Sequence, residues 1–280
     1  MVDAHTTLVG VMGDPVRHSL SPLLHNSAFD ALGLNWTSLA FEVPTGQAAS
    51  AVEGIRGLGL AGMSVTMPHK ADVAVLMDEL SPTAEQLGAV NCVARRDGML
   101  RGESTDGAGF LASLHRSEGF EPQGTRCVVL GAGGAARAVM LALAEAGAAE
   151  VVVINRTEAN AAVAAALAGK VGRSVAPSDT SGVKDALAAA DLVVNATPLG
   201  MVGQRGTDDW LVDPSLLRSG RLAADLIYVP RATPWLTAAA SAGVRTVGGL
   251  GMLVHQAAAQ IELWTGQPAP VEAMWSAVAE

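Results

Sequence analysis

The stretch CVVLGAGGAARAVMLALAEAG, Cys127 to Gly147, decides the fold. It reads without interruption as an apolar strand, a glycine turn and a helix. The strand is apolar on both faces, which is typical of a central parallel strand whose sheet is covered by helices on both sides. Gly133 has no side chain to hold a pyrophosphate away from the backbone, and the following helix points unpaired N–H groups at such an anion. The stretch therefore predicts a phosphate-binding unit.

The next apolar strand identifies the cofactor class. Val151 to Ile154 is followed by Asn155, Arg156 and Thr157, about 20 residues beyond the glycines, where a dinucleotide fold meets the adenosine ribose. An NAD site would carry Asp or Glu there, whereas the planar cationic fork of Arg156 suits a 2′-phosphate. We therefore expect NADP; the alternative is an arginine that only ends a strand in solvent.

The second half of the chain repeats strand and helix. Apolar strands recur near Val175, Leu192, Ala223 and Val244, with alanine-rich helices between them. This alternation predicts an α/β fold with a doubly wound parallel sheet. The segments DLVVNATPLGM, from Asp191, and DLIYVP, from Asp225, each combine a strand with a loop at the cofactor edge.

Composition excludes several classes of function. The chain has 280 residues, of which 50% are hydrophobic and 16% charged, and a net charge of −9, so we expect a folded protein of one or two domains without a nucleic-acid partner. The N-terminal segment MVDAHTTLVG lacks the features of a signal peptide, and no apolar run reaches about 18 residues. We expect a cytoplasmic protein with no membrane partner. Cys92 and Cys127 have neither disulfide-framework nor zinc-site spacing.

A first candidate site follows the N-terminal strand. In GDPVRHSLSPLLHN, Gly13 to Asn26, Ser21 and Pro22 predict a helix start with serine in the cap position. Ser19 and Ser21 could then hold a small carboxylate, or they could only cap the helix. His18 and His25 lack further ligands at metal-site spacing, so packing or backbone hydrogen bonding is the better interpretation.

Three further polar residues stand out. Lys70 ends SVTMPHK in the first turn of a predicted helix, close to the carboxyl end of a strand, where a cation is electrostatically unfavourable and a ligand is expected. Asn91 lies among apolar neighbours and is either a satisfied structural residue or a ligand contact. Asp106 would by itself be interpreted as a helix N-cap. After Val247, a glycine-rich hinge that begins with Gly248 and Gly249 precedes a long amphipathic helix, which suggests that the chain crosses back to the first domain.

Taken together, the segments resemble the shikimate dehydrogenase family along almost the whole chain. The matching segments, in order, are GDPVRHSLSPLLHN, SVTMPHK, GAVNCV, STDGAGF, GAGGAARA, NRT, NATPLGM, DLIYVP and GMLVHQ. The resemblance implies reversible, NADP-dependent reduction of 3-dehydroshikimate to shikimate, on the path to chorismate and the aromatic amino acids. It also implies a substrate-binding domain of residues 1–106 plus 250–280 and an NADP-binding Rossmann domain of residues 107–249.

The resemblance also implies roles for individual residues. Lys70 and Asp106 resemble the catalytic pair. The implied substrate contacts are Ser19, Ser21, Ser64, Thr66, Asn91, Tyr228 and Gln256. The implied cofactor contacts are Gly131, Ala132, Gly133, Gly134 and Ala135 at the pyrophosphate, Asn155, Arg156 and Thr157 at the adenosine phosphate, and Thr197, Met201 and Gly249 near the nicotinamide. No metal is expected, because a lysine can polarise the carbonyl.

The chain departs from the family pattern at a few positions. Ser64 and Ser104 stand where the family usually has Asn, and a serine has a shorter reach and fewer donors than an amide. Asn160 stands where some members carry a second basic residue, so phosphate recognition would depend mainly on Arg156. Substrate preference and the strictness of NADP over NAD are therefore open at this stage, as is the choice between monomer and homodimer.

Two alternatives remain on the residues alone. A dehydrogenase for quinate, aminoshikimate or a related cyclitol acid would use the same constellation. A catalytically silent NADP-binding sensor would keep the glycine turn, but it would have no physical reason to keep Lys70 and Asp106.

Overall fold

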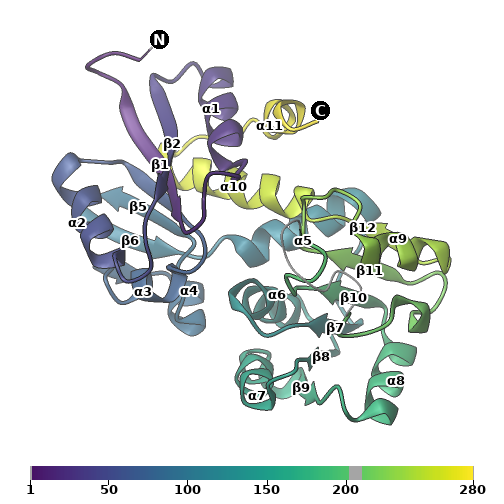
Figure 1. Ribbon diagram of the computed structural model, residues 1–280. Coiled ribbons are helices and arrows are strands. Elements are labelled where there is room, and N and C mark those ends of the chain that lie inside the picture. Colours follow the sequence, from purple (N-terminus) through teal and green to yellow (C-terminus); the bar gives the residue numbers. More distant parts are fainter. Residues whose placement is uncertain (1, 202–209, 280) are drawn as a thin grey trace. The chain divides into compact units, whose positions relative to one another are not determined.

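The computed structural model describes residues 2–201 and 210–279, and these divide into two compact units (Figure 1). The first unit is Met1–Thr105 with Val254–Glu280, and the second is Asp106–Leu253. From the sequence we expect the chain to leave the first domain after residue 106 and to return to it after residue 249. Helix α10 (Leu250–Thr265) begins in the second unit and continues into the first.

The first unit is built on a mixed sheet with the strand order β2-β1-β3-β5-β6-β4. Its strands are β1 (Thr7–Gly13), β2 (Trp36–Glu42), β3 (Gly62–Val65), β4 (Glu79–Leu80), β5 (Cys92–Arg96) and β6 (Met99–Glu103). Strand β1 pairs in parallel with β2 and β3, whereas β5 is antiparallel to both β3 and β6. The carboxyl ends of β1 and β3 therefore lie at the same edge of the sheet.

The β5–β6 hairpin follows from its turn residues. Asp97 and Gly98 both have positive φ, 51° and 82°, which is the conformation that a two-residue hairpin turn of this hand requires. The sequence GAVNCVAR, Gly88 to Arg95, predicts a strand, and the segment from Gly98 onward predicts its hairpin return. The hairpin is present, but the strand is shorter than predicted. Gly88 has φ 58° and ends the preceding helix, and β5 begins only at Cys92.

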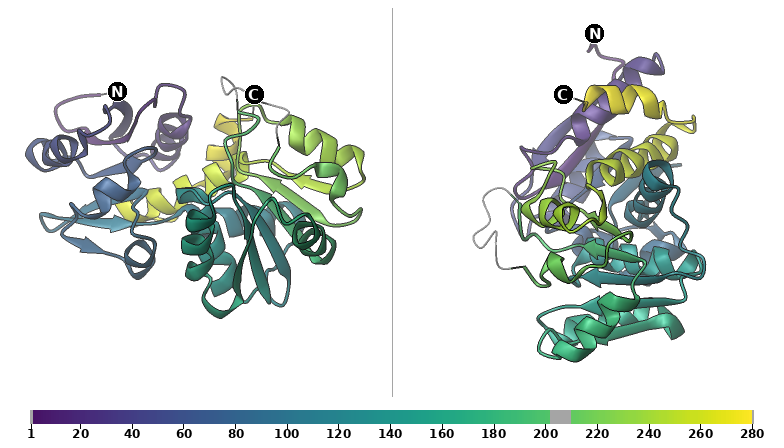
Figure 2. Two further views of the ribbon diagram at one scale, coloured as in Figure 1. Left: turned by 60° about the horizontal axis from the view of Figure 1, so that its bottom comes forward. Right: turned by 90° about the vertical axis from the view of Figure 1, so that its right-hand side faces the viewer.

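Helices cover this sheet and build its core. They are α1 (Ser21–Ala31), α2 (Ala48–Leu58), α3 (Lys70–Ala74), α4 (Pro82–Leu87), the later part of α10, and α11 (Val271–Ala277). Val52, Ile55 and Val73 from α2 and α3 join Met63 and Val93 of the sheet in one buried cluster. Helix α1 packs against β2 and against α11, which comes from the other end of the chain (Figure 2).

The start of α1 differs from the expectation. Ser21 is the first helical residue rather than the cap, and the capping position is Leu20, whose side chain makes no capping hydrogen bond. The hydroxyl of Ser19 accepts a hydrogen bond from the Ser21 N–H at 3.2 Å instead. A serine two residues before the amide thus does what a cap side chain would do. The sequence also predicts an apolar face of this helix from Leu23, Leu24, Ala28 and Leu32. Leu24 and Ala28 are buried, but Leu23 is 48% exposed, so the buried face is narrower than predicted.

The second unit contains a parallel sheet with the strand order β12-β11-β10-β7-β8-β9. Its strands are β7 (Arg126–Leu130), β8 (Glu150–Ile154), β9 (Gly172–Val175), β10 (Leu192–Asn195), β11 (Leu222–Asp225) and β12 (Arg245–Val247). Every pairing between these described strands is parallel. Starting from β7, the chain adds β8 and β9 on one side of this strand and then adds β10, β11 and β12 on its other side. The carboxyl edge between β7 and β10, where the strand order changes direction, is where open α/β sheets bind ligands.

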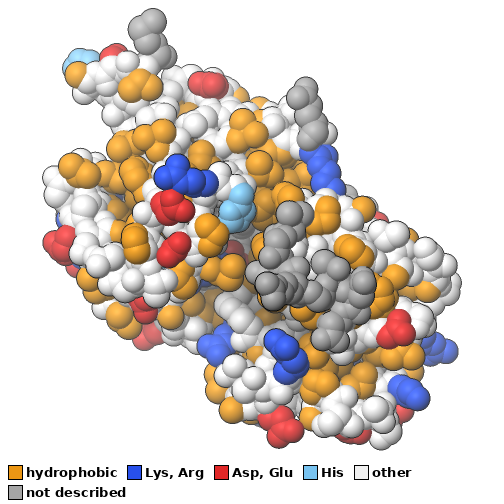
Figure 3. All heavy atoms as spheres, in the orientation of Figure 1, with side chains coloured by type: hydrophobic (Ala, Val, Ile, Leu, Met, Phe, Trp, Pro, Cys, Tyr) orange, Lys and Arg blue, Asp and Glu red, His pale blue; other side chains and the backbone are white. Residues whose placement is uncertain are grey.

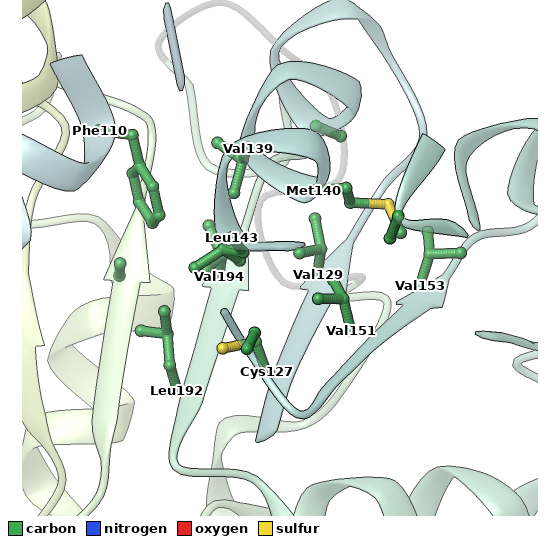
Figure 4. Packing of buried hydrophobic residues seen from close by; sticks show 14 of the residues in the cluster. Phe110, Cys127, Val129, Val139, Met140, Leu143, Val151, Val153, Leu192 and Val194 are labelled. Carbon is green, nitrogen blue, oxygen red and sulfur yellow. The ribbon is translucent and has the colours of Figure 1, made fainter. Parts of the chain in front are cut away.

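Helices lie on both faces of this sheet. They are α5 (Asp106–Glu118), α6 (Gly134–Glu145), α7 (Glu158–Leu167), α8 (Thr180–Ala189) and α9 (Pro234–Ser241), with the 3-10 turns η1 (Gly169–Val171) and η2 (Pro214–Leu216). Side chains of α5, α6 and α7 share one buried cluster with alternate strand residues, and those of α8 and α9 share the cluster on the opposite face. Figure 4 shows Val139, Met140 and Leu143 of α6 against the strands of the first of these faces. The doubly wound α/β fold expected from the sequence is confirmed.

On the face drawn in Figure 3, acidic and basic side chains are interspersed among hydrophobic and neutral ones. Among the described residues, no helix is both long enough and apolar enough to cross a membrane.

Candidate active site

The glycine turn at the carboxyl end of β7 is shaped by the strands beside it. Gly131 has φ 104°, its N–H donates to Ile154 O at 2.9 Å, and a Cβ there would lie 3.0 Å from Ala196 O. A side chain at this position would therefore be strained and crowded, whatever the ligand. Gly131 is explained by the turn itself.

The fold does not explain the glycine at position 133 in the way that it explains Gly131. It precedes α6 with ordinary backbone angles, φ −75° and ψ −176°, and a Cβ built there would meet no described atom within 4 Å. No side chain caps α6 and its first turn holds no acidic residue, so the N–H groups of Gly134 and Ala135 stand at a helix N-terminus suited to an anion. The space that a Cβ would fill at Gly133 fits the pyrophosphate of a dinucleotide.

The rest of this turn is held by protein contacts. Ala132 is buried, and its carbonyl accepts a hydrogen bond from Arg137 Nε at 3.2 Å. Arg137 lies one turn into α6, so it ties the glycine turn to the helix. The turn is thus a preorganised backbone cradle and not a loose loop.

The segment after β8 presents the residues expected at the adenosine phosphate. Asn155 is half-buried, and its Nδ2 donates to Thr157 O at 3.0 Å, which closes the turn into α7. Arg156, at the tip of this turn, is exposed, and so is Thr157, the capping residue of α7. An exposed guanidinium here is available to a 2′-phosphate.

A buried carboxylate joins the loops that follow β10 and β11. Asn195 and Asp225 are register partners at the ends of these strands, and Asn195 Nδ2 donates to Asp225 Oδ2 at 3.1 Å. The Asp225 carboxylate also accepts from Ile227 N–H at 3.0 Å and from the Thr233 hydroxyl at 2.7 Å. Burial raises the pKa of Asp225, and these hydrogen bonds oppose part of that rise.

This cluster holds Thr197, one of the expected neighbours of the nicotinamide. Asn195 Oδ1 accepts from both the N–H and the hydroxyl of Thr197, at 3.2 and 2.7 Å. Met201 and Tyr228 are half-buried in the two loops, and burial raises the pKa of the Tyr228 phenol. The sequence analysis missed Asp225 and Thr233; a carboxylate that ends an apolar strand was the available signal.

Gly249 is explained by packing. Its N–H donates to Ile227 O at 3.1 Å, and a Cβ would lie only 2.1 Å from Leu226 O. The glycine therefore permits the start of α10 to touch the loop after β11.

In the first unit, four of the expected substrate residues lie within or after β1 and β3 in the chain. Ser19 is half-buried and Ser21 buried at the start of α1, and Ser64 is buried within β3. Thr66 follows β3, and its N–H donates to Met12 O at 2.9 Å. This contact ties the end of β3 to the end of β1.

Lys70 is placed by the turn after β3. It is half-buried and is the first residue of α3, and its carbonyl accepts from Val90 N–H at 2.9 Å. Next to it, His69 is fully buried and its Nε2 lies 2.7 Å from Val43 O. The backbone on both sides of Lys70 is therefore anchored to neighbouring segments. Asp106, in the second unit, is buried as the first residue of α5 rather than its cap.

Asn91 and Gln256 belong to one buried hydrogen-bonded network. Asn91 Nδ2 donates to Thr105 Oγ1 at 2.9 Å and to Gln256 Oε1 at 3.2 Å, and Asn91 Oδ1 accepts from Thr105 N–H at 2.7 Å. Gln260, one turn after Gln256, donates to Gln256 Oε1 at 2.8 Å. Sequence reasoning proposed Asn91 and Gln256 but missed Thr105 and Gln260.

His25 and the two cysteines have structural surroundings, whereas His18 is exposed, so packing does not account for His18. His25 is fully buried with Nδ1 3.0 Å from Ser38 Oγ, so the packing interpretation of this residue holds. Burial raises the pKa of both thiols, that of Cys127 to about 11. Among the described residues, no group of His, Cys, Asp and Glu could hold a metal ion.

Models of the shikimate dehydrogenase family match most of this chain. The substrate-binding domain model matches residues 11–93, the shikimate/quinate 5-dehydrogenase model residues 114–201, and the C-terminal domain model residues 249–279. The chain is 47% identical to the NADP(+) shikimate dehydrogenase of Methanopyrus kandleri, over 100% of this chain and 97% of that protein. The chain belongs to the shikimate dehydrogenase family.

Solved structures of the family have the same fold. Shikimate 5-dehydrogenase from Listeria monocytogenes, in complex with shikimate and NAD, is 35% identical with a TM-score of 0.90, covering 98% of this chain and 97% of its own. Quinate dehydrogenase from Corynebacterium glutamicum, in complex with NAD, is 30% identical with a TM-score of 0.88, covering 98% and 99%. The resemblance inferred from the sequence motifs is confirmed.

Proposed function

We propose that this protein is an NADP-dependent shikimate dehydrogenase, which reversibly reduces 3-dehydroshikimate to shikimate. The observation that supports this most strongly is the 47% identity, over the whole chain, to a relative named for this activity. The glycine cradle supports the cofactor part, because its open space at Gly133 fits a pyrophosphate and no described neighbour requires a glycine there.

In this proposal the second unit binds the cofactor, which donates or accepts the hydride when bound. The N–H groups of the turn and of the first turn of α6 hold the pyrophosphate. Arg156, with Asn155 and Thr157, holds the 2′-phosphate. Thr197, Met201 and Gly249 lie by the nicotinamide. The proposed pyrophosphate residues are Gly131, Ala132, Gly133, Gly134 and Ala135.

The first unit binds the substrate. Ser19 and Ser21 donate their hydroxyls to the carboxylate, with Ser64, Thr66 and, from the second unit, Tyr228 near it. Asn91 and Gln256 contact ring hydroxyls. Amide groups suit this role because they can donate to and accept from hydroxyl groups, and a buried polar group left unpaired by a wrong substrate costs free energy.

Lys70 and Asp106 carry the chemistry. When a hydride adds to the carbonyl carbon, negative charge develops on the oxygen, and a positioned donor must stabilise it and transfer a proton to it. The Lys70 ammonium is that donor. The Asp106 carboxylate orients the ammonium and accepts a hydrogen bond from a substrate hydroxyl. In the reverse direction Lys70 takes up the proton that the hydroxyl releases.

The remaining parts of the proposal concern the cellular location, the oligomeric state and the pathway of the enzyme. The enzyme would act in the cytoplasm, as a monomer or homodimer, on the route to chorismate and the aromatic amino acids. Neither a metal ion nor a nucleic acid takes part.

The main alternative to this proposal is that the enzyme prefers a different substrate, quinate. Ser64 stands where the family usually has Asn, and the quinate dehydrogenase neighbour has the same fold, so quinate is the discriminating alternative. Steady-state rates with shikimate and with quinate, each with NADP and with NAD, test the proposal through the appearance of reduced cofactor. We expect the largest kcat/KM for shikimate with NADP. A larger value for quinate would overturn the substrate assignment, and a larger value with NAD would overturn the cofactor assignment.

A further inference from the structure

Gln260 is a buried amide that the proposed mechanism does not use. It lies one turn after Gln256 on α10, so both side chains project from the same face of the helix. Its side chain is fully buried. A buried amide is costly unless its polar atoms are satisfied, so its partners indicate its role.

The partners of Gln260 are the residues proposed to touch the substrate ring. Gln260 Nε2 donates to Gln256 Oε1 at 2.8 Å and to the carbonyl of Asn91 at 3.3 Å. Asn91 Nδ2 donates to the same Gln256 Oε1 at 3.2 Å. The oxygen of Gln256 thus accepts from two donors, both within the first unit. An amide whose oxygen is held in this way has only one orientation, so its Nε2 is the end that can donate to a substrate hydroxyl.

The opposite end of Gln260 faces a histidine. Burial lowers the pKa of His25 to about 3, and an interaction with the Gln260 side chain opposes part of that shift. This interaction is weak, because His25 Nε2 and Gln260 Oε1 both lack a partner at ordinary hydrogen-bond geometry among the described residues. His25 also packs edge-on against Trp264, with ring centroids 4.9 Å apart. Gln260 is therefore held between a neutral, packed imidazole on one side and the Gln256 amide on the other.

We propose that Gln260 is a positioning residue for substrate recognition: it fixes the amide orientation of Gln256, so that Gln256 presents its Nε2 to the substrate ring, and it holds the backbone of Asn91 beside it. The inference rests on the proposed function for the identity of the ligand. The orientation of Gln256 itself does not depend on it.

The test compares Gln260→Met, which keeps the size of the side chain and removes its hydrogen bonds, with the wild-type enzyme. Because Gln256 loses one of its two anchoring donors, we expect the KM for shikimate to rise about five- to tenfold. The KM for NADP stays within about twofold, since no residue of the network belongs to the proposed cofactor site. Gln260→Glu keeps the shape but puts an acceptor against Gln256 Oε1, and it provides a second variant with the same expected direction.

A matched control separates positioning from stability. Ser81 is buried in the same unit and caps α4 through a hydrogen bond from Ala84 N–H, outside the network. Ser81→Ala lowers the unfolding midpoint but leaves the KM for shikimate unchanged. If Gln260→Met and Gln260→Glu also leave that KM within twofold, the proposal is wrong.

A spectroscopic measurement keeps this test independent of turnover. The side-chain NH₂ signals of Gln256 in ¹⁵N-labelled protein report the surroundings of its amide. We expect them to move or broaden in Gln260→Met and to stay in place in Ser81→Ala. Unchanged signals in Gln260→Met would overturn the positioning role. Failure of the wild-type protein to oxidise shikimate would overturn the proposed function and leave this measurement valid.

Discussion

At the scale of single residues, Lys70 is the residue whose replacement we expect to reduce catalysis most. Lys70→Ala removes the group that we propose as the proton donor to the developing alkoxide, so turnover should fall by several orders of magnitude. NADP affinity should change little, because Lys70 lies in the unit that does not carry the glycine cradle. Lys184→Ala, which removes an exposed lysine of the second unit, is the control and should retain wild-type rates. Wild-type turnover in Lys70→Ala would remove this lysine from the chemistry.

Arg156 is the corresponding residue for cofactor selectivity. Arg156→Ala loses a charge-assisted contact to the 2′-phosphate, which contributes about 1.5 to 3 kcal/mol. The KM for NADP should therefore rise about 10- to 100-fold, whereas that for NAD should hardly change. Arg126→Ala removes an exposed arginine from the amino end of β7, opposite the glycine turn, and should alter neither value. An NADP-to-NAD preference that survives Arg156→Ala would contradict the assignment.

His25 makes stability depend on pH. Its pKa is lowered by burial from 6.5 to about 3, so the folded protein binds fewer protons than the unfolded chain between these values. His25 does not reduce the free energy of unfolding above pH 6.5, but it reduces this free energy progressively as the pH falls toward 3. At pH 5 the loss is about 2 kcal/mol.

His25→Gln should remove this dependence. Urea unfolding of both proteins at a series of pH values isolates the histidine, because all other titrating groups are shared. The free energy of unfolding of the wild type should fall toward that of the variant, or below it, between pH 7 and 5. Parallel curves over this range would show that His25 is not buried in its neutral form.

At the scale of elements, Gly249 and Gly133 both lie at helix starts, but we expect the fold to require the first glycine and cofactor binding to require the second. Gly249→Ala would put a Cβ 2.1 Å from Leu226 O, whereas Gly133→Ala meets no described atom within 4 Å. We expect Gly249→Ala to lower the unfolding midpoint strongly. Gly133→Ala should leave that midpoint unchanged but raise the KM for NADP at least tenfold, because the methyl group occupies the pyrophosphate position. Equal NADP binding in wild type and Gly133→Ala would contradict the cradle.

The elements also show where sequence patterns are informative. Strands β7, β8 and β10 are buried on both faces and were recognisable as continuous apolar runs. The start of α1 was not, because Ser21 has the residue type of a cap but the preceding Ser19 takes over its hydrogen bond. The strand expected from Gly88 begins only at Cys92, since a left-handed glycine ends α4 at Gly88. Boundaries depend on such local hydrogen bonds, which residue types alone do not specify.

At the scale of the whole molecule, the network around Gln256 shows what the sequence could not reveal. Asn91 and Gln256 are 165 positions apart, yet their amides are hydrogen-bonded in the same unit. The motifs identified both residues, but only the fold reveals that Gln260 and Thr105 hold them. Likewise Asp225 was visible as the end of a strand, while its role in joining two loops depends on the register of β10 and β11.

The central claim is that Lys70 and Asp106, from different units, act together on a substrate carbon that faces the nicotinamide. A crystal structure of the wild-type protein with shikimate and NADP bound measures this directly. We predict that Lys70 Nζ and an Asp106 carboxylate oxygen lie within hydrogen-bond distance, about 3 Å, of substrate hydroxyls, one of them on the carbon beside the nicotinamide ring. A complex in which either side chain points away from the substrate, or in which the ring faces another carbon, would contradict the account.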